Sequence, residues 1–157
     1  YLEDYGLLYN GVTLYSEYNM CPSGWHIPSD DEFFELEILA GMDPSIIYDA
    51  GWRGSTGEAG TEGPSYVLKS DVLWANLWFG PSGNGSNELG FSLAPGGMKR
   101  PNGSYTGITE LGRLWTTSDD NIVYPRDLSF SNDGIQRFSL NLDEYQNVGY
   151  NIRCIKE

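Results

Sequence analysis

The residues best suited to bind a ligand lie in one glycine-rich segment, residues 74–90. This segment carries Trp78 and Phe79 in a Gly/Pro context that offers no helical or strand face to bury them. Exposed aromatic rings stack on the apolar faces of sugars, and nearby amides and carboxylates orient such a ligand. The alternative is that both rings fold back and pack into the core beneath the loop. The candidate ligand-binding residues are Trp78, Phe79, Asn84, Asn87 and Glu88.

A second cluster, Asp119, Asp120 and Asn121, carries the hard oxygen ligands that calcium requires. Acidic residues that gather in loops are more often solvated turn residues without a metal, and this alternative stays open. We therefore expect no cofactor other than calcium, for which this cluster is the candidate site.

Catalytic chemistry has little support in the sequence. His26 is the only histidine, and its position between Trp25 and Ile27 favours a packed or hydrogen-bonded structural role over that of a general base. We find no nucleophile elbow, paired-histidine metal motif or phosphate-binding loop. The 22 acidic residues allow so many carboxylate pairs that glycoside hydrolysis is not singled out. We therefore predict that the protein is not an enzyme.

The two cysteines, Cys21 and Cys154, lie near opposite ends of the sequence. A bond between them would close most of the chain into one loop, which contributes about 4–5 kcal/mol by the chain-entropy argument. It would also imply an oxidising, exported location. Two buried free thiols in a cytosolic protein are the alternative.

Composition limits the partners and the architecture. Nine basic residues against 22 acidic ones give a formal net charge of -13, which repels nucleic acids and anionic membrane surfaces. The sequence contains no apolar run long enough to span a membrane and no recognisable signal peptide. The 157 residues fit a single domain, 1–157. Twenty glycines, eight prolines and 14% aromatic residues indicate many turns and short strands.

One long helix, at about residues 29–40, is predicted to anchor the fold. Ser29 and Glu32 have the spacing of a capping box, and Phe33, Leu36 and Ala40 form an apolar stripe from which Glu35 and Glu37 are excluded. Gly41 is placed to end the helix, and a second short helix is predicted from Asp43-Pro44 through Tyr48. Upstream of the long helix, Trp25 and Ile27 are expected to point inward.

The strand predictions are short and separated by turns. We expect one or two strands around Asn10-Gly11, a surface loop over 51–66, and a last strand at 150–154. Trp74 and Trp115 are expected in the core. The other predicted strands are 66–68, 91–93 before a tight turn at 95–97, 114–118, and a hairpin of 128–130 with 138–142 joined through Asn132-Asp133-Gly134.

Taken in order, these pieces resemble the Fibrobacter succinogenes major paralogous domain, a family of exported proteins in Fibrobacter and Bacteroidetes-type bacteria. The segments that carry the resemblance are 5–10, 21–37, 51–54, 68–70 with Trp74, 84–87, 90–92, 95–97, 103–105, 114–118 and 152–156. The family is similar to the wider C-type-lectin-like group, which implies an α+β fold of loop-rich antiparallel sheets. In such a fold Cys21 lies near the final strand, which agrees with its pairing to Cys154. The chain departs from the family pattern by an insertion around 77–81.

From these observations we expect an exported, cell-surface binding module with no membrane insertion of its own. Its ligand is expected to be a glycan, bound by the long loops at 74–90 and 119–127. The alternative is a structural or adhesin-assembly domain that binds a cell-surface protein, and an unidentified hydrolase ranks third.

Overall fold

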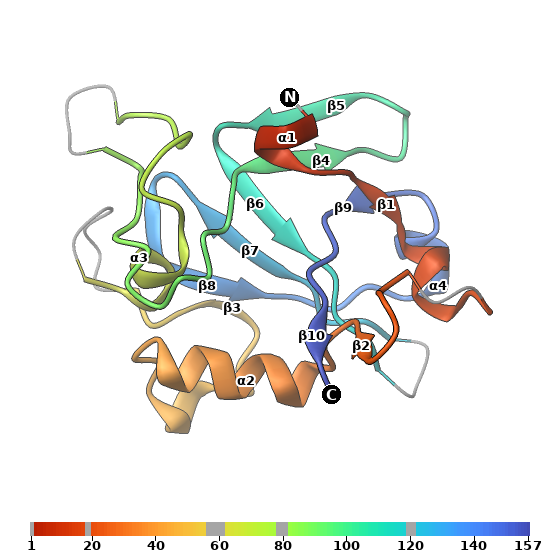
Figure 1. The fold of residues 1–157 in the computed structure, drawn as a ribbon, viewed down its shortest axis with the longest axis horizontal. Helices are drawn as coiled ribbons and strands as arrows, with labels where there is room; N and C mark the ends of the chain where they lie inside the picture. The colour runs from red at the N-terminus through yellow and green to blue at the C-terminus, as the bar shows by residue number, and fades with distance from the viewer. Residues whose placement is uncertain (1, 18–19, 56–61, 78–81, 119–121) are drawn as a thin grey trace.

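The structure is a computed structural model that describes residues 2–17, 20–55, 62–77, 82–118 and 122–157 (Figure 1). It consists of short strands with few helices, so the predicted α+β class is confirmed. Figure 1 shows the longest helix, α2, lying along one side of a twisted sheet, while α1, α3 and α4 lie around the sheet's margins.

Helix α2, Asp30–Leu39, begins as the sequence predicts. The Ser29 hydroxyl accepts from the Glu32 backbone N–H at 3.2 Å, and the Glu32 carboxylate accepts from the Ser29 backbone N–H at 2.8 Å, which completes the capping box. Gly41 has a φ of 95°, in the left-handed region that commonly ends a helix. The short helix η2, Pro44–Ile46, follows as predicted but ends two residues early.

The main sheet has the strand order β1, β9, β4, β6, β7, β8, β3, and β5 also pairs with β4. Neighbouring strands run antiparallel except β4 and β6, which are parallel at Gly97 and Gly112. The pairing of β1 with β9 brings the two ends of the chain side by side. The strands are β1 Tyr9–Asn10, β3 Gly51–Arg53, β4 Gly96–Lys99, β5 Tyr105–Ile108, β6 Leu111–Leu114, β7 Arg126–Ser129, β8 Asn132–Arg137 and β9 Gly149–Tyr150.

A second, two-stranded sheet also joins the ends. It consists of β2, Trp25–His26, and β10, Ile155–Lys156. Beside it, Cys21 and Cys154 form a disulfide between residues 133 positions apart, with their Cα atoms 5.8 Å from each other. The predicted pairing is therefore confirmed, and the alternative of two free thiols is wrong.

The remaining helical turns are α1 Leu2–Tyr5, η1 Gly11–Tyr15, α3 Pro64–Leu68 and α4 Leu142–Tyr145. The prediction of a strand at 66–68 is wrong, because these residues belong to α3. Pro64 stands at the start of that helix, where its fixed φ and missing N–H favour helix initiation. Of the strands expected around Asn10-Gly11, the structure has β1 alone, followed directly by η1.

The predicted hairpin turn at 132–134 is also wrong. Ser129 pairs with Asn132, so β7 and β8 turn at residues 130–131, and 132–134 form the start of β8. Gly134 is required there for close packing, since a Cβ on it would lie 2.6 Å from the Arg53 carbonyl oxygen of the neighbouring β3. The glycine that indicated a turn therefore serves the contact between two strands.

Other strand boundaries shift for similar reasons. Residues 91–93 form only a bridge from Leu93 to Lys69, while the predicted turn at 95–97 lies at the start of β4. The predicted strand 114–118 ends at Leu114. Of the predicted strand 150–154 only Tyr150 lies in a strand, β9, while Asn151 forms a bridge to Leu114 and β10 begins after the range, at Ile155. Ile27 is buried as expected, but Trp25 is 38% exposed at the end of the two-stranded sheet.

Two clusters form the core. The first lies between α2 and the sheet and includes Phe33 and Trp74, and the second includes Trp115 and Tyr150. The predicted burial of Trp74 and Trp115 is confirmed, with 5% and 0% of their surface exposed. Among the residues that the structure describes, no helix is both long enough and apolar enough to cross a membrane.

Candidate ligand-binding site

The structure describes three of the five residues predicted to bind a ligand. Asn84 and Asn87 are half-buried and Glu88 is exposed, while Trp78 and Phe79 lie outside the described residues. The predicted calcium cluster at 119–121 also lies outside them. Within the described ranges, no group of three or more histidine, cysteine, aspartate or glutamate side chains is arranged to hold a metal ion.

The two asparagines hold the loop in shape. Asn84 Oδ1 accepts from the Trp74 backbone N–H at 2.9 Å, and Asn87 Oδ1 accepts from the Ser92 backbone N–H at 2.7 Å. Gly85 packs so closely that an added Cβ would lie 2.2 Å from the Tyr66 carbonyl oxygen. The polar and glycine content of this segment therefore builds a compact loop, and of the three described candidates Glu88 extends most freely into solvent.

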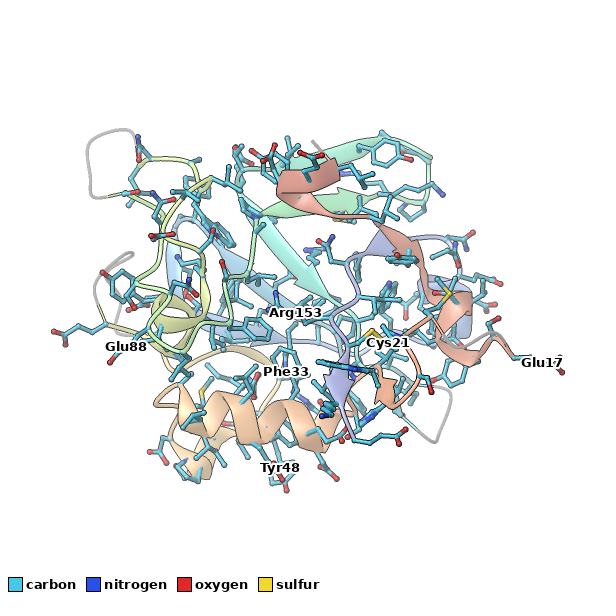
Figure 2. The ribbon with its side chains drawn as sticks, in the orientation of Figure 1. Glu17, Cys21, Phe33, Tyr48, Glu88 and Arg153 are labelled. Carbon is cyan, nitrogen blue, oxygen red and sulfur yellow. A yellow bond between two sulfur atoms is a disulfide. The ribbon has the colours of Figure 1, made fainter. Side chains whose placement is uncertain are left out.

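The described parts of the two predicted contact loops lie apart. Asn84 to Glu88 lie beside α3, whereas the Ser118 carbonyl accepts a hydrogen bond from Tyr15 in η1. Figure 1 places α3 on the left and β2 right of centre, and Glu88 and Glu17 are labelled on opposite sides of Figure 2. The expectation that 119–127 is a contact loop is also wrong in its second half, because Arg126 and Asp127 are buried in β7.

An open groove of about 390 Å³ lies at the η1 end of the molecule, beside β2. We call it the η1 groove. Its polar lining comes from Thr13 and Ser16 of the η1 region, Glu17, His26 of β2, and Thr117, and Met20 adds an apolar surface. Figure 2 labels Glu17 at this end, with Cys21 between it and the centre of the molecule.

Local bonds fix the walls of the η1 groove. The Asn10 side chain caps η1 by accepting from the Val12 N–H at 3.0 Å, and the Thr13 hydroxyl donates to the Asn10 carbonyl at 2.7 Å. On the opposite wall, the Thr117 N–H donates to the Pro28 carbonyl at 2.9 Å. The disulfide at Cys21 ties the segment between these walls to the end of the chain. The groove is thus built from segments that are distant in sequence and held at fixed separations.

His26 belongs to the groove wall and contacts a carboxylate. Its Nε2 lies 2.8 Å from Glu32 Oε1. Burial acts to raise the pKa of Glu32, but hydrogen bonds from Ser29 and His26 outweigh it and lower that pKa from its ordinary value. His26 Nδ1 is buried and has no hydrogen-bond partner among the described residues, so no hydroxyl or thiol there is placed as a nucleophile. The hydrogen bond to Glu32 agrees with the structural role predicted for His26.

A buried ionic cluster was missed at the sequence level. Glu37 is fully buried, and its carboxylate accepts hydrogen bonds from Arg53 at 2.6 and 3.0 Å and from Arg126 Nε at 2.7 Å. Asp30 extends the cluster through two ion pairs. Its carboxylate lies 2.6 Å from Arg137 Nη2 and 2.8 Å from Arg126 Nη2, and the geometry of the Arg126 contact is not that of a hydrogen bond. The available signal was spacing, because Glu37 follows Phe33 by four residues and so shares the buried face.

The comparisons with known proteins agree with the resemblance seen in the sequence. A family model described as the Fibrobacter succinogenes major domain matches residues 1–156, nearly the full length of the chain. No curated protein and no solved structure matches the chain.

Proposed function

The chain belongs to the Fibrobacter succinogenes major domain family, and we propose that it is an exported, cell-surface module that binds a glycan without transforming it. The observation that carries this proposal is the η1 groove, an open cavity of about 390 Å³ lined by both polar and apolar residues.

Export is supported by the disulfide. Cys21 and Cys154 are bonded, and disulfides persist in oxidising compartments and are rare in the cytosol. We also propose that the fold belongs to the C-type-lectin-like group. In support, the chain ends are joined by β1 with β9 and by β2 with β10, and one principal helix packs on the sheet.

The chemistry of the η1 groove suits an uncharged, hydroxyl-rich ligand. The hydroxyls of Thr13 and Thr117 donate to backbone carbonyls, which leaves their oxygen lone pairs to accept from a sugar hydroxyl. Glu17 provides an exposed carboxylate, and Met20, which is 36% exposed, provides an apolar surface for a sugar ring. Few fixed polar groups beside an apolar surface are typical of specific small-ligand sites.

The loop at 74–90 is a second surface for the same proposal. Its candidates remain Trp78, Phe79, Asn84, Asn87 and Glu88, with calcium at Asp119, Asp120 and Asn121 as a proposed cofactor. None of the described candidates, Asn84, Asn87 and Glu88, lines the η1 groove, so a single set of variants distinguishes the two surfaces.

The test is a glycan array probed with the oxidised domain and four variants. Thr117→Val and Glu17→Gln alter the η1 groove, Trp78→Ala alters the loop, and Glu35→Gln is a control because Glu35 is exposed on α2. We expect the wild-type domain to bind a glycan on the array. Thr117→Val and Glu17→Gln should each weaken that binding about tenfold, because each removes one hydrogen bond to the ligand. Loss of binding only in Trp78→Ala would assign the site to the loop instead. A blank array would contradict glycan binding altogether.

Calcium is tested separately by the melting temperature of the folded domain. A site in the native state must raise this temperature in excess calcium and lower it in EDTA, by mass action. Equal melting temperatures in both would exclude a folded-state calcium site.

The second candidate function is protein binding in surface assembly. Leu2, Leu7, Tyr105 and Ile108 are 62%, 54%, 72% and 43% exposed, and they line a cavity of about 350 Å³ beside β5. Exposed apolar residues next to an edge strand are typical of a protein contact surface. A photocrosslinking group at Tyr105 that captures one defined surface protein, lost on Leu7→Ser, would favour this function. The absence of any crosslinked surface protein would count against protein binding.

A further inference from the structure

Arg153 carries a positive charge that no described carboxylate neutralises. It lies between β9 and β10, and its guanidinium carbon stacks over Phe91 at 4.6 Å from the ring centroid. Among the described residues, Arg153 forms no ion pair, in contrast to Arg53, Arg113 and Arg126, which all contact carboxylates. Burial lowers the pKa of Arg153, and no carboxylate opposes this effect. The guanidinium is exposed to solvent and contacts an aromatic ring, but no described carboxylate pairs with it.

An apolar pocket opens directly beside this arginine. The pocket has a volume of about 180 Å³ and is lined by Pro28, Phe33, Leu36, Phe91 and Ile155, with Glu32 and Arg153 at its margin. Figure 2 shows Arg153 and Phe33 close to one another in the centre of the molecule, between α2 and the end of the chain. A space of this size and lining suits a single apolar side chain.

The carboxylate of Glu32 does not supply the missing counter-charge. Its oxygens accept from the Ser29 N–H at 2.8 Å and from the Ser29 hydroxyl at 2.9 Å, and contact His26 at 2.8 Å. These bonds form the capping box of α2 and hold the carboxylate on the helix side. The guanidinium thus remains available to an anion that enters from solvent.

Arg153 also lines a second cavity, of about 210 Å³. Its polar residues include Ser92, Asn151 and the carboxylate Asp4. A ligand whose anion meets Arg153 would therefore adjoin both an apolar space and a partly polar space. The C-terminal residue of a polypeptide fits this arrangement. Its Cα atom carries the terminal carboxylate, the side chain and the preceding peptide group, which point in three different directions.

We propose that Arg153 and the adjoining apolar pocket bind the C-terminal residue of a partner polypeptide, with a Phe- or Leu-type side chain in the pocket and the terminal carboxylate on the guanidinium. An arginine fork binds a carboxylate through two parallel hydrogen bonds, which are stronger than neutral ones. This site is independent of the glycan surface, since the η1 groove contains neither Arg153 nor Phe91.

The test uses the ¹⁵N-labelled, oxidised domain titrated with the acetylated tripeptide Gly-Gly-Phe, as the free acid and as the C-terminal amide, at 0.15 M salt. We expect the acid to shift the amide resonances of Phe91 and Ile155 and to bind about tenfold or more tightly than the amide, because only the acid offers the guanidinium a charged acceptor. Arg153→Gln should remove this difference, and Arg153→Lys should retain part of it.

Arg100→Gln is the matched control, since it removes one exposed arginine on the β4–β5 hairpin and should leave binding unchanged. Near-native melting temperatures of the Arg153 variants would verify that they fold. Equal binding of acid and amide, or full binding by Arg153→Gln, would overturn the proposal. Phenylacetate that binds as tightly as the tripeptide would overturn the assignment to a polypeptide end.

Discussion

The buried cluster around Glu37 gives the sharpest stability prediction. Glu37 is 0% exposed, and both of its oxygens accept from arginines that are themselves 3% and 0% exposed. Burial lowers the pKa of Arg53, and the hydrogen bonds and charge of Glu37 oppose that effect. Removal of the carboxylate therefore leaves two guanidinium groups buried with only Asp30 to compensate one of them.

The variant Glu37→Gln preserves the size of the side chain but not its acceptors. Whichever way the amide is oriented, its NH₂ group faces an arginine donor, because Arg53 and Arg126 occupy both oxygen positions in the wild type. Breaking a buried ion pair from one side costs about 3–5 kcal/mol. For a chain of this length that loss lowers the melting temperature by about 6–20 °C.

The assay is urea denaturation of the oxidised protein, with the unfolding midpoint and slope compared between variants. Glu35→Gln, an exposed neighbour on the same helix, should change the free energy of unfolding by less than about 0.5 kcal/mol. The double variant Glu37→Met with Arg53→Met should be more stable than Glu37→Gln, because it removes charge from both sides of the pair. A Glu37→Gln effect no larger than that of Glu35→Gln would refute the reasoning.

Three further predictions concern single features of the fold. Replacing Cys21 and Cys154 by alanine should lower the free energy of unfolding by about 5 kcal/mol, read from urea midpoints, and an unchanged midpoint would mean that the bond does not constrain the unfolded chain. Burial raises the pKa of Asp127 to about 6, only partly opposed by Arg113, so the folded state binds more protons than the unfolded state between the unfolded pKa and that value. The free energy of unfolding should therefore carry a contribution that falls as pH rises from about 4 to about 6, and Asp127→Asn should abolish it; equal pH profiles would contradict this. Ser29→Ala should cost about 1 kcal/mol by loss of the α2 cap, and a melting temperature equal to that of the wild type would argue against the capping box.

Signals that act over a few residues were predicted correctly. The capping box at Ser29 and Glu32, the left-handed Gly41 and the short helix after it all rest on contacts within one or two helical turns. The disulfide is a different case, because its cysteines lie 133 positions apart and two free thiols stayed open as the alternative, with the family resemblance adding support for the bond.

Signals with two physical causes were misread. Gly134 was interpreted as a turn residue, although it is a glycine because Arg53 of the neighbouring strand passes within reach of any Cβ. Glu37 was placed off the apolar stripe because it is charged, although its spacing puts it on the buried face. In both cases the deciding neighbour lies far away in sequence.

The sequence by itself determined the α+β class, the position and caps of the main helix, the burial of Trp74 and Trp115, and membership of the Fibrobacter succinogenes major domain family. Only the tertiary structure decided that Asn84 to Glu88 lie apart from the η1 groove, that Glu37 meets Arg126 across 89 residues, and that Arg153 stacks on Phe91 beside an apolar pocket. The physical reason is the distance along the sequence between the residues that interact. Caps, turns and periodicity follow from covalent neighbours, whereas ligand sites and buried charge pairs depend on which distant segments the core brings into contact.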